Sequence, residues 1–336
     1  MKHGEQTKII SLDNLSIGYR SNRKTNKIVK SKISASADTG ELVALIGENG
    51  IGKSTLLKTI AGFQQPIHGE LQICGKPIVS YTEKELALIM SFVSTEIIRV
   101  SNLTVFDLVS LGRFPHTNWF GKIVDQDRAL IEEAIEAVGL SGFEYRMVDH
   151  LSDGERQKAM IARTLAQDTQ LIVLDEPTAF LDLSNKYEIV HLLHRLAHEK
   201  GKTILFSTHD LTTAIAESDK LWLMLNDSIE QGAPEDLIMN GNLNRLFQNN
   251  TLYFDQQHGD FRIPRKKGKE VFVVGEGLAL AWTIKALARN GFTQSDTAEN
   301  GLIKITINYP TWSLSYLSHN EEFNSLFSLC RYLNTI

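Results

Sequence analysis

Cysteine is scarce in this sequence, since only Cys74 and Cys330 occur among its 336 residues. Two cysteines so far apart cannot form the disulfide framework of a small secreted domain, and their scarcity favours a reducing compartment. Long apolar runs are also missing. The most apolar stretch, residues 271–288, is interrupted by Glu276 and Lys285, whereas a membrane-spanning helix needs about 20 apolar residues in a row. The first eight residues contain no apolar segment, so we expect no secretory signal and no insertion into the bilayer.

An excess of basic charge is absent as well. The 35 lysines and arginines are outnumbered by 40 aspartates and glutamates, which gives a net charge of −5. Proteins whose main task is to bind nucleic acid are usually basic, so we expect no nucleic-acid partner. One segment departs from this balance, because residues 20–32 hold six basic residues and no acidic residue. We favour a solvated hairpin loop there over a contact with nucleic acid or lipid.

Apolar residues make up 42% of the chain, enough for a large core, and the length predicts about two domains. Short apolar strands alternate with segments of helical periodicity, which is typical of a parallel sheet with helices on both faces. The predicted strands are residues 8–17, 28–37, 41–46, 171–174, 203–207 and 221–225. The predicted helices are residues 53–61, 83–88, 104–138 with a break at 112–121, 152–167, 185–199 and 211–216.

The composition changes in the C-terminal quarter of the chain. We predict a main domain at residues 7–249, a basic linker at 250–270 and a small accessory domain at 271–336. The last part has a β-α-β-α pattern, with strands at 271–274 and 302–308 and helices at 278–290 and 321–333. Gly275-Glu276-Gly277 hints at a dinucleotide fingerprint, but Leu280 stands where the third glycine should be. A packing or regulatory role is therefore favoured over ligand binding.

A glycine-rich loop follows one of the predicted strands. It matches the phosphate-binding pattern G-x-x-x-x-G-K-[ST] and precedes a predicted helix, which is the context that this motif requires. Its glycines let backbone N–H groups surround phosphate oxygens, and the helix N-terminus adds partial positive charge. Lys53 should reach the β- and γ-phosphates of a nucleotide, and the Ser54 hydroxyl should coordinate Mg²⁺. The loop consists of Gly47, Glu48, Asn49, Gly50, Ile51, Gly52, Lys53, Ser54 and Thr55.

Two carboxylates, Asp175 and Glu176, come directly after the apolar strand at residues 171–174. Asp175 is placed to hold Mg²⁺ through its water shell. Glu176 can point at the γ-phosphate and accept a proton from the attacking water. An Asp-Glu pair is a weak signal by itself, but it becomes strong after a buried strand with a phosphate loop upstream.

Residues 151–157, Leu-Ser-Asp-Gly-Glu-Arg-Gln, resemble the LSGGQ signature of the nucleotide-binding subunits of ATP-binding-cassette (ABC) transporters. The resemblance extends over residues 7–249. It implies that Ser152, Gly154 and Glu155 contact the nucleotide held by an opposite subunit. Ser152 and Glu155 also form the pattern of a helix capping box, and both interpretations can hold at once, because a capped helix end also binds anions.

Three more residues match the family in chain order. Asp182 lies in a run that resembles the family's loop after the catalytic glutamate, which contacts the opposite subunit, and His209 resembles the switch histidine that bonds the γ-phosphate and Glu176. Tyr19 resembles the aromatic residue that stacks on adenine. Considered alone, such a histidine is more often structural, and such a tyrosine more often belongs to the core or the surface.

One element departs from the family. Where related proteins carry a glutamine that contacts Mg²⁺ and the lytic water, residues 92–96 read Phe-Val-Ser-Thr-Glu. Thr95 occupies the place of the glutamine, but its hydroxyl is too short to copy the amide. Glu96 has the length and adds a charge. Either Thr95 or Glu96 is therefore the candidate metal contact.

The resemblance implies an α/β P-loop NTPase cassette with a parallel-sheet core, a β-rich N-terminal subdomain, a helical signature subdomain and a small C-terminal α/β appendage. It implies an ATP hydrolase that uses ATP and Mg²⁺ and pairs head-to-tail with a second copy of itself. The other implied partners are permease subunits docked near residues 95–116 and, indirectly, a substrate-binding protein. Such a subunit would lie peripherally on the cytoplasmic face of the cell membrane.

The transported compound is suggested by residues 111–116, Leu-Gly-Arg-Phe-Pro-His. This run resembles cassettes that import iron–siderophore complexes, haem or cobalamin. The alternative function is a soluble ABC ATPase acting on ribosomes or DNA. It is disfavoured because the chain has a single phosphate loop, and because no sustained heptads separate that loop from the signature.

Overall fold

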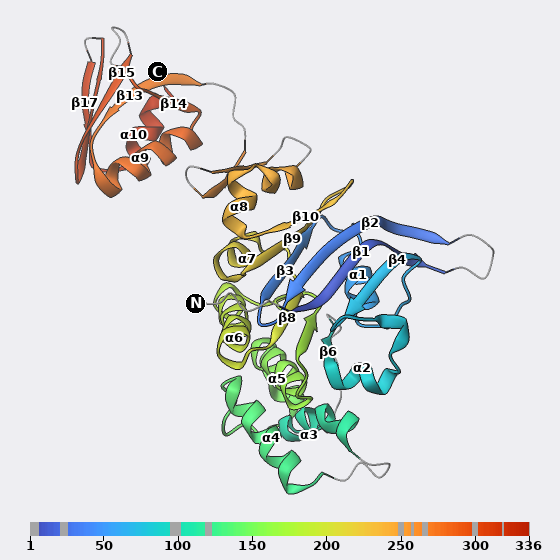
Figure 1. The fold of residues 1–336 in the computed structure, drawn as a ribbon. Coiled ribbons are helices and arrows are strands. Elements are labelled where there is room, and N and C mark those ends of the chain that lie inside the picture. The colour runs from blue at the N-terminus through green and yellow to red at the C-terminus, as the bar shows by residue number, and fades with distance from the viewer. Residues whose placement is uncertain are drawn as a thin grey trace, which may run out of the picture. The chain divides into compact units, whose positions relative to one another are not determined.

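The computed structural model describes residues 7–20, 26–94, 102–117, 123–247, 252–256, 259–263, 268–297, 302–317 and 319–335. The chain divides into two compact units, Met1–Gln248 and Asn249–Ile336 (Figure 1). Each unit has its own hydrophobic core. Among the described residues, every helix is too short or too polar to cross a membrane.

A six-stranded sheet forms the centre of the first unit, in the order β10-β9-β3-β8-β7-β6. The five strands from β9 to β6 run parallel, and β10 pairs antiparallel to β9. The middle strands are buried along their whole length, as expected for a parallel sheet covered on both faces. The predicted parallel-sheet core is confirmed. The strands are β3 (Leu42–Gly47), β6 (Met90–Val93), β7 (Leu171–Leu174), β8 (Thr203–Ser207), β9 (Lys220–Met224) and β10 (Ile229–Gly232).

A second, antiparallel sheet has the order β2-β1-β4-β5. It contributes Ile10, Ile17 and Ile33 to a hydrophobic cluster that also contains Leu45 of the central sheet and Leu57 of α1. The helix α1 (Lys53–Ile60) is thereby fixed between the two sheets. The strands are β1 (Lys8–Tyr19), β2 (Lys27–Asp38), β4 (His68–Ile73) and β5 (Lys76–Pro77).

Helices α3 and α4 pack against α5, away from the antiparallel sheet (Figure 1). Leu108, Ile131 and Ile135 are buried in this packing. The helices of the first unit after α1 are α2 (Glu83–Ile89), α3 (Val105–Ser110), α4 (Asp125–Ala137), α5 (Asp153–Ala166), α6 (Leu183–Lys200), α7 (Leu211–Glu217) and α8 (Pro234–Met239). Short 3-10 turns are η1 (Ile78–Ser80), η2 (Leu111–His116), η3 (Val148–His150) and η4 (Asn242–Phe247).

The second unit contains a five-stranded sheet in the order β14-β13-β15-β16-β17. Its core gathers Val271, Ile305 and Leu314 from the sheet with Leu287 and Leu329 from the helices. The elements are β11 (Tyr253–Asp255), β12 (Asp260–Arg262), β13 (Lys269–Val274), α9 (Gly277–Arg289), β14 (Phe292–Ser295), β15 (Ile303–Asn308), β16 (Thr311–Tyr316), β17 (His319–Phe323) and α10 (Leu326–Leu333).

The predicted helix at 321–333 is wrong over its first five residues. Residues up to Phe323 belong to β17, which pairs with β16 through Trp312↔Phe323. The helix α10 starts only at Leu326, where the Ser325 hydroxyl accepts the N–H of Ser328 at 3.2 Å. Cross-strand pairing here outweighs the helical preference of the glutamates before Phe323. Strands β14 and β16 were not predicted, and the predicted linker contains the β11–β12 hairpin.

A chain truncated after residue 250 should keep the first unit folded. The prediction follows because the two units have separate hydrophobic clusters. We expect the thermal unfolding midpoint of the truncated chain, and its affinity for the nucleotide that the family resemblance implies, to match those of the first unit in the full chain. Aggregation, or a loss of nucleotide affinity, would mean that the second unit completes the core of the first.

Candidate nucleotide-binding and hydrolysis site

The glycine-rich loop lies between β3 and α1, as its sequence predicts. Gly50 and Gly52 adopt φ angles of 79° and 111°, which residues with a side chain rarely adopt. A Cβ at Gly47 would lie 2.7 Å from the carbonyl oxygen of Met224. The loop can therefore make its tight turn over the sheet only with glycine at these positions.

Lys53 is almost buried, with 5% of its surface exposed. Its Nζ donates to the carbonyl oxygens of Gly47 and Glu48, at 2.8 and 3.2 Å. Burial lowers the pKa of Lys53, and the nearby carboxylates of Glu176 and Asp175 oppose that shift. The ammonium group thus lies along the loop, where phosphate oxygens can replace the carbonyl oxygens as its acceptors.

Asp175, directly after β7, is hydrogen-bonded to α1 and to β8 at the carboxyl end of the sheet. Its Oδ1 accepts hydrogen bonds from Ser54 Oγ at 3.1 Å and from Ser207 Oγ at 2.8 Å. Ser207 Oγ in turn accepts the backbone N–H of Glu176 at 2.9 Å. These residues meet because β3, β8 and β7 are parallel neighbours whose carboxyl ends share one edge. Sequence reasoning missed Ser207, and the available signal was a hydroxyl closing an apolar strand two residues before His209.

Glu176 and His209 face each other at the same edge. His209 Nε2 lies 2.6 Å from Glu176 Oε1. Glu176 has a φ of 49°, in the left-handed region that non-glycine residues rarely adopt. Such strained positions concentrate at functional sites. The turn after β7 therefore directs the carboxylate toward the glycine-rich loop and the histidine.

An open cavity of about 550 Å³ borders this cluster. Tyr19 stands at its rim with 54% of its surface exposed, and its hydroxyl lies 3.4 Å from Thr55 Oγ1. The residues that line the cavity are Tyr19, Lys27, Ile28, Val29, Asn49, Gly50, Gly52, Lys53, Ser54, Thr55 and Glu176.

The predicted solvated loop at 20–32 needs correction at Lys30. Lys27 lines the cavity, and Lys30 is buried, where its Nζ donates to the carbonyl oxygen of Leu225. Burial lowers the pKa of Lys30, while Asp227 opposes the shift. Lys27, Lys30 and Lys32 all belong to β2, which begins one residue before the predicted strand at 28–37, and Lys27 and Lys32 remain exposed.

The signature residues do not line this cavity. Ser152 caps α5, since its Oγ accepts the N–H of Glu155 at 3.3 Å and its own N–H donates to Glu155 Oε2 at 2.7 Å. The hydrogen bond that the Ser152 N–H donates to the Glu155 carboxylate is the main cause that lowers the pKa of Glu155. A Cβ at Gly154 would lie 2.5 Å from Asn185 Oδ1.

Asp182 also lies outside the cavity lining. Its carboxylate accepts the N–H of Asn185 at 2.9 Å. Thr95 and Glu96 lie outside the described residues.

The turn η2 is fixed to the C-terminal end of α5. Arg113 Nε donates to Asp127 Oδ1, and its Nη1 donates to the carbonyl oxygen of Ala166, both at 2.8 Å. His116 Nε2 lies 2.9 Å from the carbonyl oxygen of Gln167. Phe114 remains 74% exposed. The turn therefore presents an aromatic side chain to solvent while the side chains of Arg113 and His116 hold it against the end of the helix that begins at the signature.

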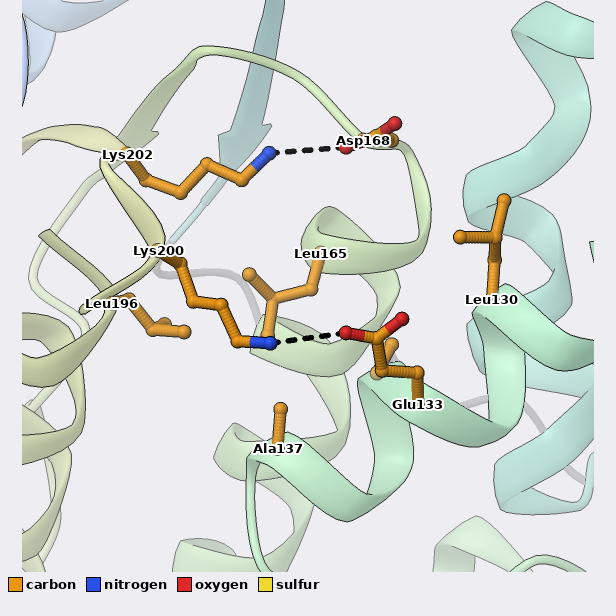
Figure 2. Close-up of a pocket in the computed structure, with 9 residues that line it drawn as sticks. Leu130, Glu133, Ala137, Leu165, Asp168, Leu196, Lys200 and Lys202 are labelled. Carbon is orange, nitrogen blue, oxygen red and sulfur yellow. Dashed lines mark hydrogen bonds and ion pairs between the residues drawn. The ribbon is translucent and has the colours of Figure 1, made fainter.

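A second cavity, of about 250 Å³, lies between α4, α5 and α6. Figure 2 shows its aliphatic lining, which includes Leu130, Leu165 and Leu196. Two ion pairs cross it, Lys200–Glu133 at 3.0 Å and Lys202–Asp168 at 3.1 Å (Figure 2). Because each lysine pairs with a carboxylate, neither lysine is available to bind an anion in this cavity.

The phosphate loop, the carboxylates that follow β7 and the parallel sheet beneath them define a P-loop ATPase. Residues 31–179 match the ABC transporter family, and residues 267–334 match the iron ABC transporter C-terminal domain. An ABC transporter ATP-binding protein of Methanocaldococcus jannaschii is 37% identical over 84% of this chain and 97% of its own length. The iron(3+)-hydroxamate import ATP-binding protein of Bacillus subtilis is 37% identical over 71% of this chain and 87% of its own length.

Solved structures agree with these sequence matches. A metal-chelate type ABC transporter in an inward-facing conformation superposes with a TM-score of 0.62 at 30% identity, covering 72% of this chain and 89% of that one. The chain therefore belongs to the ATP-binding proteins of ABC transporters, an ATP-hydrolysing family. The match to the C-terminal domain family covers the part of the chain for which sequence reasoning found no motif.

Proposed function

We propose that this chain binds ATP with Mg²⁺ in the cavity bordered by Tyr19, Lys53 and Glu176. The observation that carries the proposal is the hydrogen-bonded series from Ser54 through Asp175 and Ser207 to Glu176. Ser54 Oγ and Asp175 Oδ1 lie 3.1 Å apart. Mg²⁺ prefers oxygen ligands and usually keeps several of its waters, so the Ser54 hydroxyl would coordinate the ion and Asp175 would hold it through its water shell. Bound Mg²⁺ would neutralise charge on the phosphates.

Within this site, each residue has a distinct role. Lys53 exchanges its carbonyl acceptors for phosphate oxygens, and the Tyr19 ring stacks on adenine. Glu176 accepts the proton of the attacking water, and His209 holds the Glu176 carboxylate through the 2.6 Å contact. Ser207 positions both carboxylates, because it bonds Asp175 and the backbone of Glu176.

The active form pairs two copies head-to-tail. The support is that Ser152, Gly154 and Glu155 do not line the cavity of their own chain. Ser152 is exposed at the start of α5, and Phe180, in the loop before Asp182, is 80% exposed. A second chain would bring its signature against the γ-phosphate and cover Phe180. The N-terminus of α5 suits that role, because its N–H groups and dipole favour anions.

ATP-binding proteins of ABC importers work with permease subunits, and within the described part of this chain no helix could cross a membrane. We infer that permease subunits dock near the exposed Phe114 and that the chain lies on the cytoplasmic face of the membrane. The transported compound is an iron chelate, or a related compound such as haem or cobalamin. The similarity to the B. subtilis hydroxamate import protein and the match to the iron C-terminal domain family support this substrate. An ATPase acting on ribosomes or DNA has no such support.

Deletion of the gene should abolish uptake of one iron chelate, or of a related compound such as cobalamin, from the medium. The measurement is accumulation of a radiolabelled ferric siderophore, haem or cobalamin by the deletion strain. Complementation with the wild-type gene should restore uptake, and complementation with the Glu176→Gln gene should not. Normal uptake of all three compounds by the deletion strain would overturn the substrate assignment and leave the ATPase proposal intact.

A further inference from the structure

The outward face of α9 in the second unit is apolar. Leu278 is 76% exposed and Trp282 is 56% exposed. Together with the exposed Ala281, they lie at helical spacings of three and four residues, so they form one stripe. Lys285 continues the stripe, with its Nζ 5.1 Å from the centre of the Trp282 ring.

The opposite face of the same helix packs against the core of the second unit. Thr283, Ala286 and Leu287 are buried. The indole Nε1 of the buried Trp312 donates to Thr283 Oγ1 at 2.9 Å, which fixes the rotation of α9 on the sheet. Because α9 is apolar on both faces, it has the composition of a helix that is covered on both sides. The stripe at Leu278 and Trp282 therefore needs a covering partner.

The charges of α9 indicate which partner covers the stripe. Glu276 stands at the start of the helix, and Lys285 and Arg289 stand near its end. Trp282 lies close to the midpoint, six residues after Glu276 and seven before Arg289. If a second α9 packed antiparallel about a two-fold axis at this midpoint, each Glu276 would face the basic end of the other helix. The small Ala281 would let the two helices approach closely.

We propose that the α9 face is a docking surface for the α9 face of a second copy of this chain. A two-fold axis is the commonest symmetry of homodimers, and it makes one self-complementary patch sufficient. The contact does not require nucleotide. Its strength in the working transporter rests on the proposed pairing of the ATPase units, because that pairing would hold two α9 helices at a high effective concentration.

Cysteine cross-linking of the nucleotide-free full chain tests this arrangement. In a Cys74→Ser background, which removes the exposed thiol, Ala281→Cys should form a disulfide-linked dimer under mild oxidation. Ala288→Cys is the matched control, because it is an exposed alanine on the same helix. It lies seven residues from Ala281, about 10 Å along the axis, so its two copies would be about 20 Å apart. That separation is far beyond the reach of a disulfide.

The results separate the proposal from its rivals. Cross-linking of Ala281→Cys but not of Ala288→Cys is the expected result. Equal cross-linking at both positions would mean a parallel or random contact, and cross-linking at neither would mean that the first unit or a lipid surface covers the stripe. Either outcome overturns the proposal. Repeating the test in a Lys53→Ala chain keeps it independent of the proposed ATP site.

Two further variants probe the chemistry of the contact. Trp282→Ala should slow cross-linking through Ala281→Cys at least about tenfold, since a central tryptophan is typically an energetic hot spot. Leu317→Asn is its control, because Leu317 is 80% exposed but lies in the turn after β16. Glu276→Lys should also slow cross-linking, and adding Arg289→Glu should restore it. Failure of the double variant to restore the rate would contradict the antiparallel register.

Discussion

A Glu176→Gln chain should bind ATP as tightly as the wild type but hydrolyse it about 10²–10⁴-fold more slowly. The amide keeps the size of the side chain and its contact with His209, which lies 2.6 Å away in the wild type, but it cannot accept a proton from water. The measurements are phosphate release and equilibrium binding of ATP. With hydrolysis blocked, the ATP-bound dimer should accumulate on a sizing column in Mg²⁺-free ATP.

Two controls separate this loss of chemistry from a loss of binding. Lys53→Ala should fail at the binding step and remain monomeric when ATP is added. Glu188→Gln removes a carboxylate of α6 that pairs with Lys158 and is 53% exposed, so its hydrolysis rate should stay at the wild-type value. Hydrolysis by Glu176→Gln at the wild-type rate would overturn the assignment of Glu176 as the base.

Arg113→Ala should destabilise the first unit by about 3–5 kcal/mol, because it leaves a buried carboxylate without its cation. The side chains of Arg113 and Asp127 are only 8% and 11% exposed, and their atoms lie 2.8 Å apart. The same substitution removes the donor to the carbonyl oxygen of Ala166 at the end of α5. The measurement is the free energy of unfolding from urea titration of the first unit.

Arg128→Ala is the matched control, since Arg128 pairs with Glu132 on the surface of the same helix. Their side chains are 54% and 53% exposed, so solvent screens the pair and we expect little or no loss of unfolding free energy. An equal loss in both variants would contradict the argument from burial.

The same ion pair predicts a dependence on pH. The hydrogen bond from Arg113 is the largest cause that lowers the pKa of Asp127. A carboxyl whose pKa is lower in the folded state stabilises the protein above its unfolded pKa of about 4 and loses that contribution as the pH falls. The difference in unfolding free energy between wild type and Arg113→Ala should therefore shrink below about pH 4.

The parts of the site that could be predicted are continuous in the chain. The phosphate loop, the carboxylates after β7 and the cap at Ser152 are short motifs whose local backbone is dictated by their own residues. Tyr19 and His209 were found only through resemblance to a family, because a single aromatic or histidine carries no local signal. The roles of all these residues stay predictions until the variants are measured.

Other features depend on contacts between distant parts of the chain. Ser207 bonds Asp175 across 32 positions, and Arg113 reaches Ala166 across 53. Lys27 lines the cavity only because β2 pairs with β1 beside the loop. The start of α10 was mispredicted because pairing with β16 draws Phe323 and the residues before it into a strand.

The sequence by itself determined the class of this protein. The phosphate-binding motif and the alternation of apolar strands with helices are both local patterns, which can be recognised without the tertiary structure. The tertiary structure decided which side chains support the carboxylates and which helix face stays uncovered. The physical reason is that a helical pattern of three and four residues marks every apolar position of α9 alike. Only the packing of Thr283 and Leu287 against the sheet leaves Leu278 and Trp282 on the outside.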